Sequence, residues 1–79
     1  MGKVLSKNGF DVVIYTADHE PAHVHVFKSG KEAKIYLADL QTEDKGMKKQ
    51  ELKQALDLVK QNQGYLWSKW EEMHGQCNR

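Results

Sequence analysis

Two histidines separated by one residue, His23 and His25, are the residues in this sequence best suited to chemistry. They lie in an alternating stretch typical of a β-strand, which places both side chains on one side with Cβ atoms about 6.5–7 Å apart. Two imidazoles at this spacing can share one Zn²⁺ ion, with zinc–nitrogen bonds of about 2.0–2.1 Å. A zinc site needs a third ligand. The candidates are Asp18 and His19 in the preceding loop, and Asp39 and His74 from elsewhere in the chain.

The same histidine pair supports two other interpretations. A histidine beside a phosphodiester can act as a general acid or base, so the pair predicts a ribonuclease that needs no metal. Lysines of the adjoining hairpin would then hold phosphates: Lys28, Lys31 and Lys34. The more ordinary role of such lysines is to solvate a hairpin and block strand addition. The more ordinary role of the histidines is to pack on Phe27 or a tryptophan and to donate hydrogen bonds to the backbone.

Length and composition set limits on the function. Residues 1–79 are expected to form a single small domain, to which a homodimer or a metal would add stability. Twelve basic and 11 acidic residues give a net charge of +1, so overall charge points to neither a nucleic acid nor a membrane. The one cysteine, Cys77, excludes an internal disulfide, and no basic cluster activates it as a catalytic thiolate. No apolar run reaches the roughly 18 residues of a membrane span, and no secretory signal is recognisable, so the cytoplasm is expected.

Alternation with a period of two predicts a three-stranded antiparallel meander within residues 10–40, after a polar N-terminal lead over residues 1–9. The strands are expected at residues 10–15, 23–28 and 32–40, with turns at Asn8-Gly9 and Ser29-Gly30. Val24 and Val26 form the more apolar side of the middle strand, so a helix should cover that side. His23 and His25 are therefore expected on the open, solvent-facing side.

From residue 47 the apolar period changes to 3.6, which predicts a helical segment over residues 47–74. Gly64 inside a helix costs about 1 kcal/mol relative to alanine, so we expect a kink there or two helices that meet near Asn62. Residues 75–79 should form a frayed tail. The predicted fold class is thus α+β, a three-stranded antiparallel meander packed against a long, kinked or broken C-terminal helix.

The stretch His19–Val26, H-E-P-A-H-V-H-V, is followed by a short hairpin and a helix containing Trp70. This arrangement resembles a small bacterial family, domain-of-unknown-function family 4160, over about residues 10–74. The typical member carries a proline, an aromatic residue and often a histidine at three positions of this stretch and of the helical segment. In this chain, those positions are occupied by Ala22, Val24 and Asn62, respectively.

The resemblance implies a binding partner. Genes of this family often lie beside another small gene, an arrangement similar to toxin–antitoxin pairs. We therefore expect a binding or regulatory protein in such a pair, with a small partner protein encoded nearby. Contacts with that partner are expected at a sheet edge, at Lys28, Lys31 and Lys34, and at Trp67 or Trp70 if either is exposed. The alternative is a His-dependent ribonuclease or metal-dependent hydrolase that uses His23 and His25, with RNA as a second expected partner.

Overall fold

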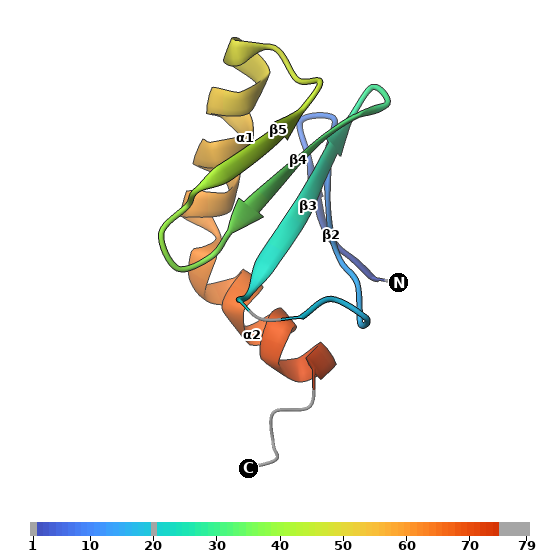
Figure 1. The fold of residues 1–79 in the computed structure, drawn as a ribbon, viewed down its shortest axis with the longest axis vertical. Coiled ribbons are helices and arrows are strands. Elements are labelled where there is room, and N and C mark those ends of the chain that lie inside the picture. The colour runs from blue at the N-terminus through green and yellow to red at the C-terminus, as the bar shows by residue number, and fades with distance from the viewer. Residues whose placement is uncertain (1, 20, 75–79) are drawn as a thin grey trace.

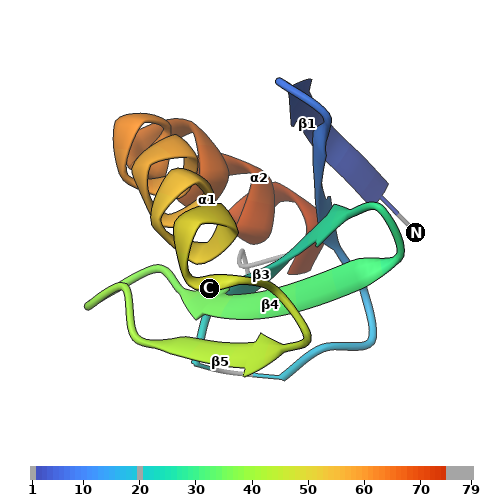
Figure 2. The same ribbon diagram turned by 90° about the horizontal axis from the view of Figure 1, so that it is seen from above.

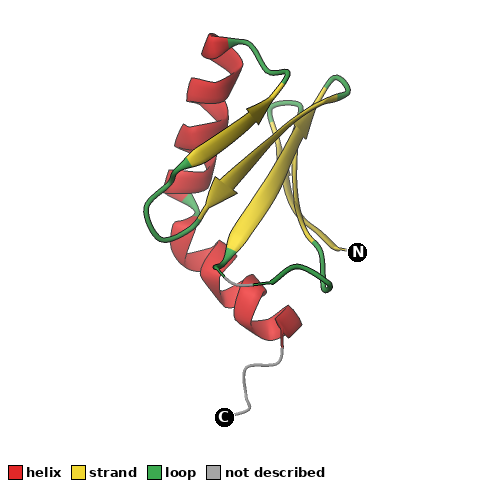
Figure 3. Ribbon diagram, viewed as in Figure 1, coloured by secondary structure: helices red, strands yellow, loops and turns green. Residues whose placement is uncertain are grey.

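A sheet and two helices make up the fold of residues 2–19 and 21–74, which the computed structural model describes (Figure 1). Five antiparallel strands lie in the order of the chain: β1 Gly2–Lys7, β2 Phe10–Ile14, β3 His23–Lys28, β4 Lys31–Tyr36 and β5 Thr42–Lys45. The helices are α1 Lys49–Gln61 and α2 Gln63–His74. Figure 3 distinguishes the strands, in yellow, from the helices, in red, and all five strands precede both helices in the chain. The predicted α+β class is confirmed, whereas the predicted count of three strands is wrong.

The two additional strands, β1 and β5, are the edge strands. Their sequences explain why the alternation of apolar residues does not predict them. β1 occupies the predicted polar lead, and its register against β2 shifts between Lys3 and Leu5, which breaks the period of two. β5 consists of Thr42, Glu43, Asp44 and Lys45, of which none is apolar. Edge strands of this kind carry charged residues that discourage pairing with other chains.

The helices cover one face of the sheet, and the sheet curves around them (Figure 2). Val24 and Val26 of β3 are fully buried on that face, as predicted. The buried core is completed by apolar residues from the other elements, including Phe10, Val12, Ile14, Ala33, Ile35, Leu58, Val59, Leu66 and Trp70. Because side chains alternate along a strand, this packing directs His23 and His25 to the opposite face.

The helical segment is divided at Asn62, the second of the two predicted outcomes. The Asn62 side chain donates to the Leu58 carbonyl over 2.8 Å, and Gln63 donates to the Leu37 carbonyl beneath it. Beyond them, α2 passes the beginning of β3, where Trp70 packs on His23. Within the described residues, neither helix is long and apolar enough to cross a membrane.

Two-residue loops join β1 to β2 and β3 to β4, in agreement with the predicted turns. Asn8 and Gly9 have φ values of 55° and 82°, and Ser29 and Gly30 have φ values of 52° and 77°. Positive φ at both central residues is the pattern of a type I′ turn, whose twist matches that of the flanking strands. The turns thereby set the register that aligns β3 with β4.

Candidate metal centre

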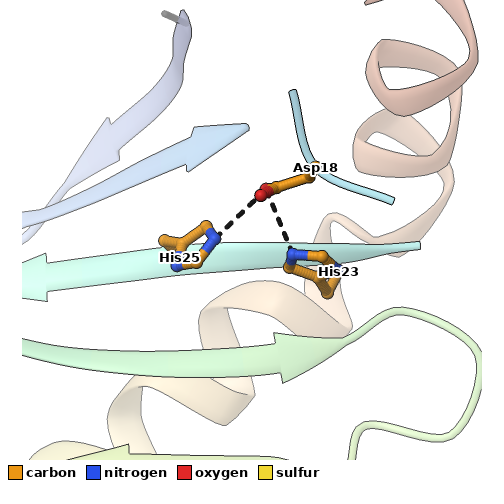
Figure 4. Close-up of side chains that lie close together, drawn as sticks. All are labelled: Asp18, His23 and His25. Carbon is orange, nitrogen blue, oxygen red and sulfur yellow. Dashed lines mark hydrogen bonds and ion pairs between the residues drawn. The ribbon is translucent and has the colours of Figure 1, made fainter. Parts of the chain in front are cut away.

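Asp18 and the two histidines converge on one point at the open face of the sheet (Figure 4). The Asp18 Oδ2 atom lies 3.1 Å from His23 Nε2 and 3.2 Å from His25 Nε2. One ligand atom from each of the three residues lies within 4.8 Å of the others. The sequence predicts four candidate metal ligands in or next to the histidine strand: Asp18, His19, His23 and His25. The structure brings three of them together, all but His19.

The elements around the cluster explain its placement. His23 and His25 alternate with the buried valines of β3, and Asp18 comes from the loop that joins β2 to β3. A turn in that loop, closed by the Asp18 N–H donating to the Tyr15 carbonyl over 3.1 Å, folds the aspartate back over the strand. The Tyr15 ring packs edge-on against His25, with 4.9 Å between the ring centroids.

Each histidine uses its Nδ1 atom to reach an oxygen that can only accept a hydrogen bond. His23 Nδ1 lies 2.9 Å from the Pro21 carbonyl, and His25 Nδ1 lies 2.8 Å from Glu32 Oε2. A carbonyl oxygen and an ionised carboxylate have no proton to give, so both Nδ1 atoms carry the hydrogen. In a neutral imidazole the other nitrogen is then a lone pair.

In that neutral form both Nε2 lone pairs face the Asp18 carboxylate, which is itself an acceptor. Three acceptors at these distances repel one another unless a proton or a metal cation lies between them. The hydrogen bonds at Nδ1 are the outer contacts that orient histidine ligands in metal sites, where the second nitrogen donates to a carboxylate or a backbone carbonyl. The arrangement has the polarity that a bound cation requires.

The two distances from Asp18 Oδ2 are also close to those around a tetrahedral ion. Metal–ligand bonds of 2.0–2.1 Å give ligand–ligand separations of about 3.3–3.4 Å in a tetrahedron. The two separations from Asp18 Oδ2, 3.1 and 3.2 Å, need to widen by only a few tenths of an ångström. One aspartate and two histidines are hard and intermediate ligands that suit Zn²⁺.

The comparisons with known proteins give one match. A family model described as "Domain of unknown function (DUF4160)" matches residues 9–71. The chain belongs to the DUF4160 family. The comparison with curated proteins and that with solved structures each gave no match. The matched range of this DUF4160 chain contains every residue of the cluster.

His23 is more deeply enclosed than expected. It is only 5% exposed, because the Asp18 loop covers one side of its ring and Trp70 of α2 packs on another at 5.4 Å between centroids. The prediction that both histidines face solvent is therefore wrong for His23, and the His25 side chain is only 12% exposed. The contact with a tryptophan and the bond to a backbone carbonyl are those of the ordinary packing interpretation.

The other candidate ligands of this DUF4160 chain lie outside the cluster. His19 is exposed and lines the cavity in front of the triad without joining it. Asp39 accepts a hydrogen bond from the Gln41 N–H over 3.1 Å. His74 stacks on Trp70 with 3.8 Å between the ring centroids.

The three hairpin lysines are separated by the fold. Lys28 lies over the Phe10 ring at 4.5 Å, and Lys31 pairs with Glu51 at 3.5 Å. Lys34 alone faces the histidine cluster, because it is paired with His25 across β3 and β4. A phosphate-binding row of three lysines does not form.

The two tryptophans are not exposed anchors. Trp70 is 2% exposed within the core, and Trp67 is half-buried against the core. Cys77 and the predicted tail over residues 75–79 lie outside the described residues.

A cavity of about 370 Å³ opens in front of the cluster. Its walls come from the β2–β3 loop, β3, β4 and the end of β5: Ala17, Asp18, His19, Pro21, His23, His25, Lys34, Tyr36 and Lys45. This volume is at the lower end of the range of small-molecule sites. A second cavity, of about 340 Å³, is lined by Lys7, Phe10 and residues of α1 and does not border the cluster.

Two residues of the site were missed from the sequence, Glu32 and Lys45. Both belong to strands on the far side of a turn from the histidines, so spacing along the chain does not connect them. The strand register gives the missing signal for Glu32, because β4 pairs with β3 from His23↔Tyr36 to Lys28↔Lys31. Lys45 lies in β5, whose sequence carries no strand pattern.

Lys34 is held in its charged form. The Tyr36 hydroxyl is the main cause of a raised pKa of Lys34, and the charges of Glu43 and Asp18 add to it. The Lys34 ammonium lies 5.0 Å from the centre of the Tyr36 ring. A fixed positive charge thus stands beside His25 at the cavity wall.

Proposed function

We propose that this protein is a cytoplasmic metal-binding protein with a site of hydrolytic type, in which Asp18 Oδ2, His23 Nε2 and His25 Nε2 hold one Zn²⁺-like divalent cation. The observation that carries the proposal is the commitment of both Nδ1 atoms to acceptor oxygens, 2.9 and 2.8 Å away. It leaves two lone pairs and a carboxylate pointing at each other. A cation resolves that conflict.

Three protein ligands and an adjacent cavity support hydrolysis over a purely structural role. Structural zinc sites are closed by four protein ligands, whereas catalytic sites keep one position for water or substrate. Here the fourth side of the cluster faces the cavity of about 370 Å³. Metal-bound water is a nucleophile at neutral pH, which is the chemistry that such a site supplies.

Zinc titration by calorimetry of the wild-type chain and of Asp18→Asn tests the proposal. Asparagine keeps the size of the side chain and removes the charged ligand, and Asp18 lies in a loop, so the variant should fold. We expect one bound Zn²⁺ per chain and an affinity at least about 100-fold weaker in Asp18→Asn. The matched control is His19→Ala, which alters the neighbouring residue at the same cavity and should bind zinc as the wild type does.

Imidazole ¹H–¹⁵N spectra of the same samples identify the binding atoms. Zinc should shift the Nε2 resonances of His23 and His25 and leave hydrogens on both Nδ1 atoms. Absence of zinc binding, with protons on both Nε2 atoms, would refute the metal site and favour the metal-free His-dependent ribonuclease. That alternative predicts RNA cleavage without metal, lost in His25→Ala.

A role as one half of a toxin–antitoxin-like pair is the second candidate. Its support is the open sheet, in which, among the residues that the structure describes, β1 and β5 each have one side free of a partner strand. A small protein encoded nearby could add a strand to one of these edges, and a second copy of the chain could do the same in a homodimer. Co-expression with the neighbouring gene product tests this role by co-purification and by the size of the complex. No complex at micromolar concentrations would count against the pair, and the same sizing run reports a homodimer.

A further inference from the structure

The cavity in front of the metal centre has two lysines on its wall, Lys34 of β4 and Lys45 of β5. Lys34 is directly opposite His25 in the sheet, and side chains at such paired positions lie about 4.5–5.5 Å apart at Cβ. Lys45 is two residues after Glu43, the partner of Lys34, so it projects from the same face. Two ammonium groups therefore share the open face with the metal ligands.

Within the described part of the chain, these ammonium groups have no carboxylate partner of their own. Among residues 2–19 and 21–74, no carboxylate lies within ion-pair distance of the Lys34 or Lys45 ammonium, although Lys3, Lys31 and Lys69 each have one. Glu43, the acid of β5 on the same face as both lysines, accepts a hydrogen bond from the Tyr36 hydroxyl over 3.4 Å. Both lysines are thus available to an anion in the cavity.

The charge of the site depends on the metal. Among the described residues that line the cavity, Asp18 is acidic and Lys34 and Lys45 are basic, which gives a sum of +1. A divalent cation raises that sum to +3. An anion is therefore attracted more strongly to the cavity once a cation is bound.

We infer that the loaded site binds the phosphate group of a phosphate ester, with one oxygen on the metal and others on Lys34 and Lys45. This inference rests on the metal centre proposed above. A phosphate has enough terminal oxygens to serve a metal and two ammonium groups together, whereas a carboxylate has two oxygens and a single charge. The cavity volume of about 370 Å³ admits a phosphate with a small organic group.

The probe is inorganic phosphate, observed by ³¹P NMR with the protein in excess over Co²⁺. Bound Co²⁺ is paramagnetic and broadens the resonance of a phosphate that coordinates it. We expect broadening with the Co²⁺-loaded wild type and none with the metal-free protein. The double variant Lys34→Gln/Lys45→Gln should bind phosphate at least about tenfold more weakly while it keeps its Co²⁺. The matched control, Lys53→Gln/Lys60→Gln, removes two exposed charges from α1 and should behave as the wild type does.

The outcomes separate the inference from the proposal on which it rests. A wild-type chain that fails to bind Co²⁺ refutes the metal centre itself. Three results would each overturn the inference alone. Either the chain binds Co²⁺ but not phosphate, or it binds acetate as tightly as phosphate, or the double lysine variant binds phosphate as tightly as the wild type. Displacement of phosphate by phenyl phosphate identifies a small phosphorylated molecule as the ligand class, and displacement by a uridine dinucleotide identifies RNA. Displacement by neither overturns the assignment to an ester.

Discussion

Substitution of Glu32 tests the metal centre through a residue that does not touch the ion. Glu32 Oε2 accepts the hydrogen bond from His25 Nδ1 over 2.8 Å, and its side chain is 28% exposed. The carboxylate fixes the orientation of the ring and makes Nε2 a stronger donor to the metal. Glu32 is therefore a positioning residue, and its removal should weaken zinc binding without abolishing it.

The magnitude follows from the geometry. Adding the hydrogen bond, the width of the ring and a metal–nitrogen bond places the carboxylate roughly 7 Å from the ion. Coulomb's law then gives about 1 kcal/mol in water and about 5 kcal/mol at an effective dielectric constant of 20. Partial exposure of Glu32 favours the lower part of that range. Losses of about 10–100-fold in affinity, typical of such outer contacts, correspond to about 1.4–2.7 kcal/mol and lie within it.

Two substitutions divide the effect into orientation and charge. In Glu32→Gln the amide oxygen still accepts from Nδ1–H, so only the charge is lost and we expect about tenfold weaker zinc binding. In Glu32→Ala both are lost, and we expect a decrease of about 100-fold. Calorimetric zinc titrations measure both values. The control is Glu43→Gln, which removes a carboxylate from the same face that contacts Tyr36 instead of a histidine. Wild-type affinity in Glu32→Ala would refute the reasoning.

Two further predictions concern stability. Ser29 has a φ of 52°, a conformation that asparagine tolerates better than serine, as Asn8 does in the equivalent turn. Ser29→Asn should raise the free energy of unfolding by about 0.5–1 kcal/mol, measured by urea denaturation, and an unchanged or lower value would contradict the assigned turn. The pKa of Glu51 is lowered because its carboxylate accepts the Lys48 N–H at the start of α1. A lowered folded-state pKa means stability that is present above the ordinary glutamate pKa of 4.5 and lost as pH falls through the folded-state pKa. The stability of Glu51→Gln should therefore fall less than that of the wild type between pH 6 and about pH 3, and parallel profiles would disprove the capping role.

The parts of the fold that bury apolar side chains are the parts that the sequence predicts. β2, β3 and β4 alternate because one face packs on the helices, and the 3.6-residue period follows from the stripe that α1 and α2 bury. The break at Asn62 was visible from the glycine that follows it. Neither edge strand could be read this way, because β5 has no apolar residue and the irregular register of β1 interrupts its pattern.

Only part of the candidate site could be predicted from the sequence, for a related reason. The two histidines and Asp18 lie within eight residues, so local spacing identifies them. The burial of His23 could not be foreseen, because it depends on where Trp70 lies after α2 has turned at Asn62. Glu32 and Lys45 reach the site through pairing between strands, and that pairing is set by turns and core packing.

The proposed ligands and the two groups that accept hydrogen bonds from the histidine Nδ1 atoms all fall in one segment of 15 residues, from Asp18 to Glu32. Bringing such close neighbours together costs little chain entropy compared with a site gathered from distant segments. The site is in effect a cassette, a loop and a hairpin that carry their own ligands and outer hydrogen bonds. Such a cassette can be transferred to another antiparallel sheet with the same turn. The host needs only an aromatic side chain beneath the first histidine, where Trp70 lies here.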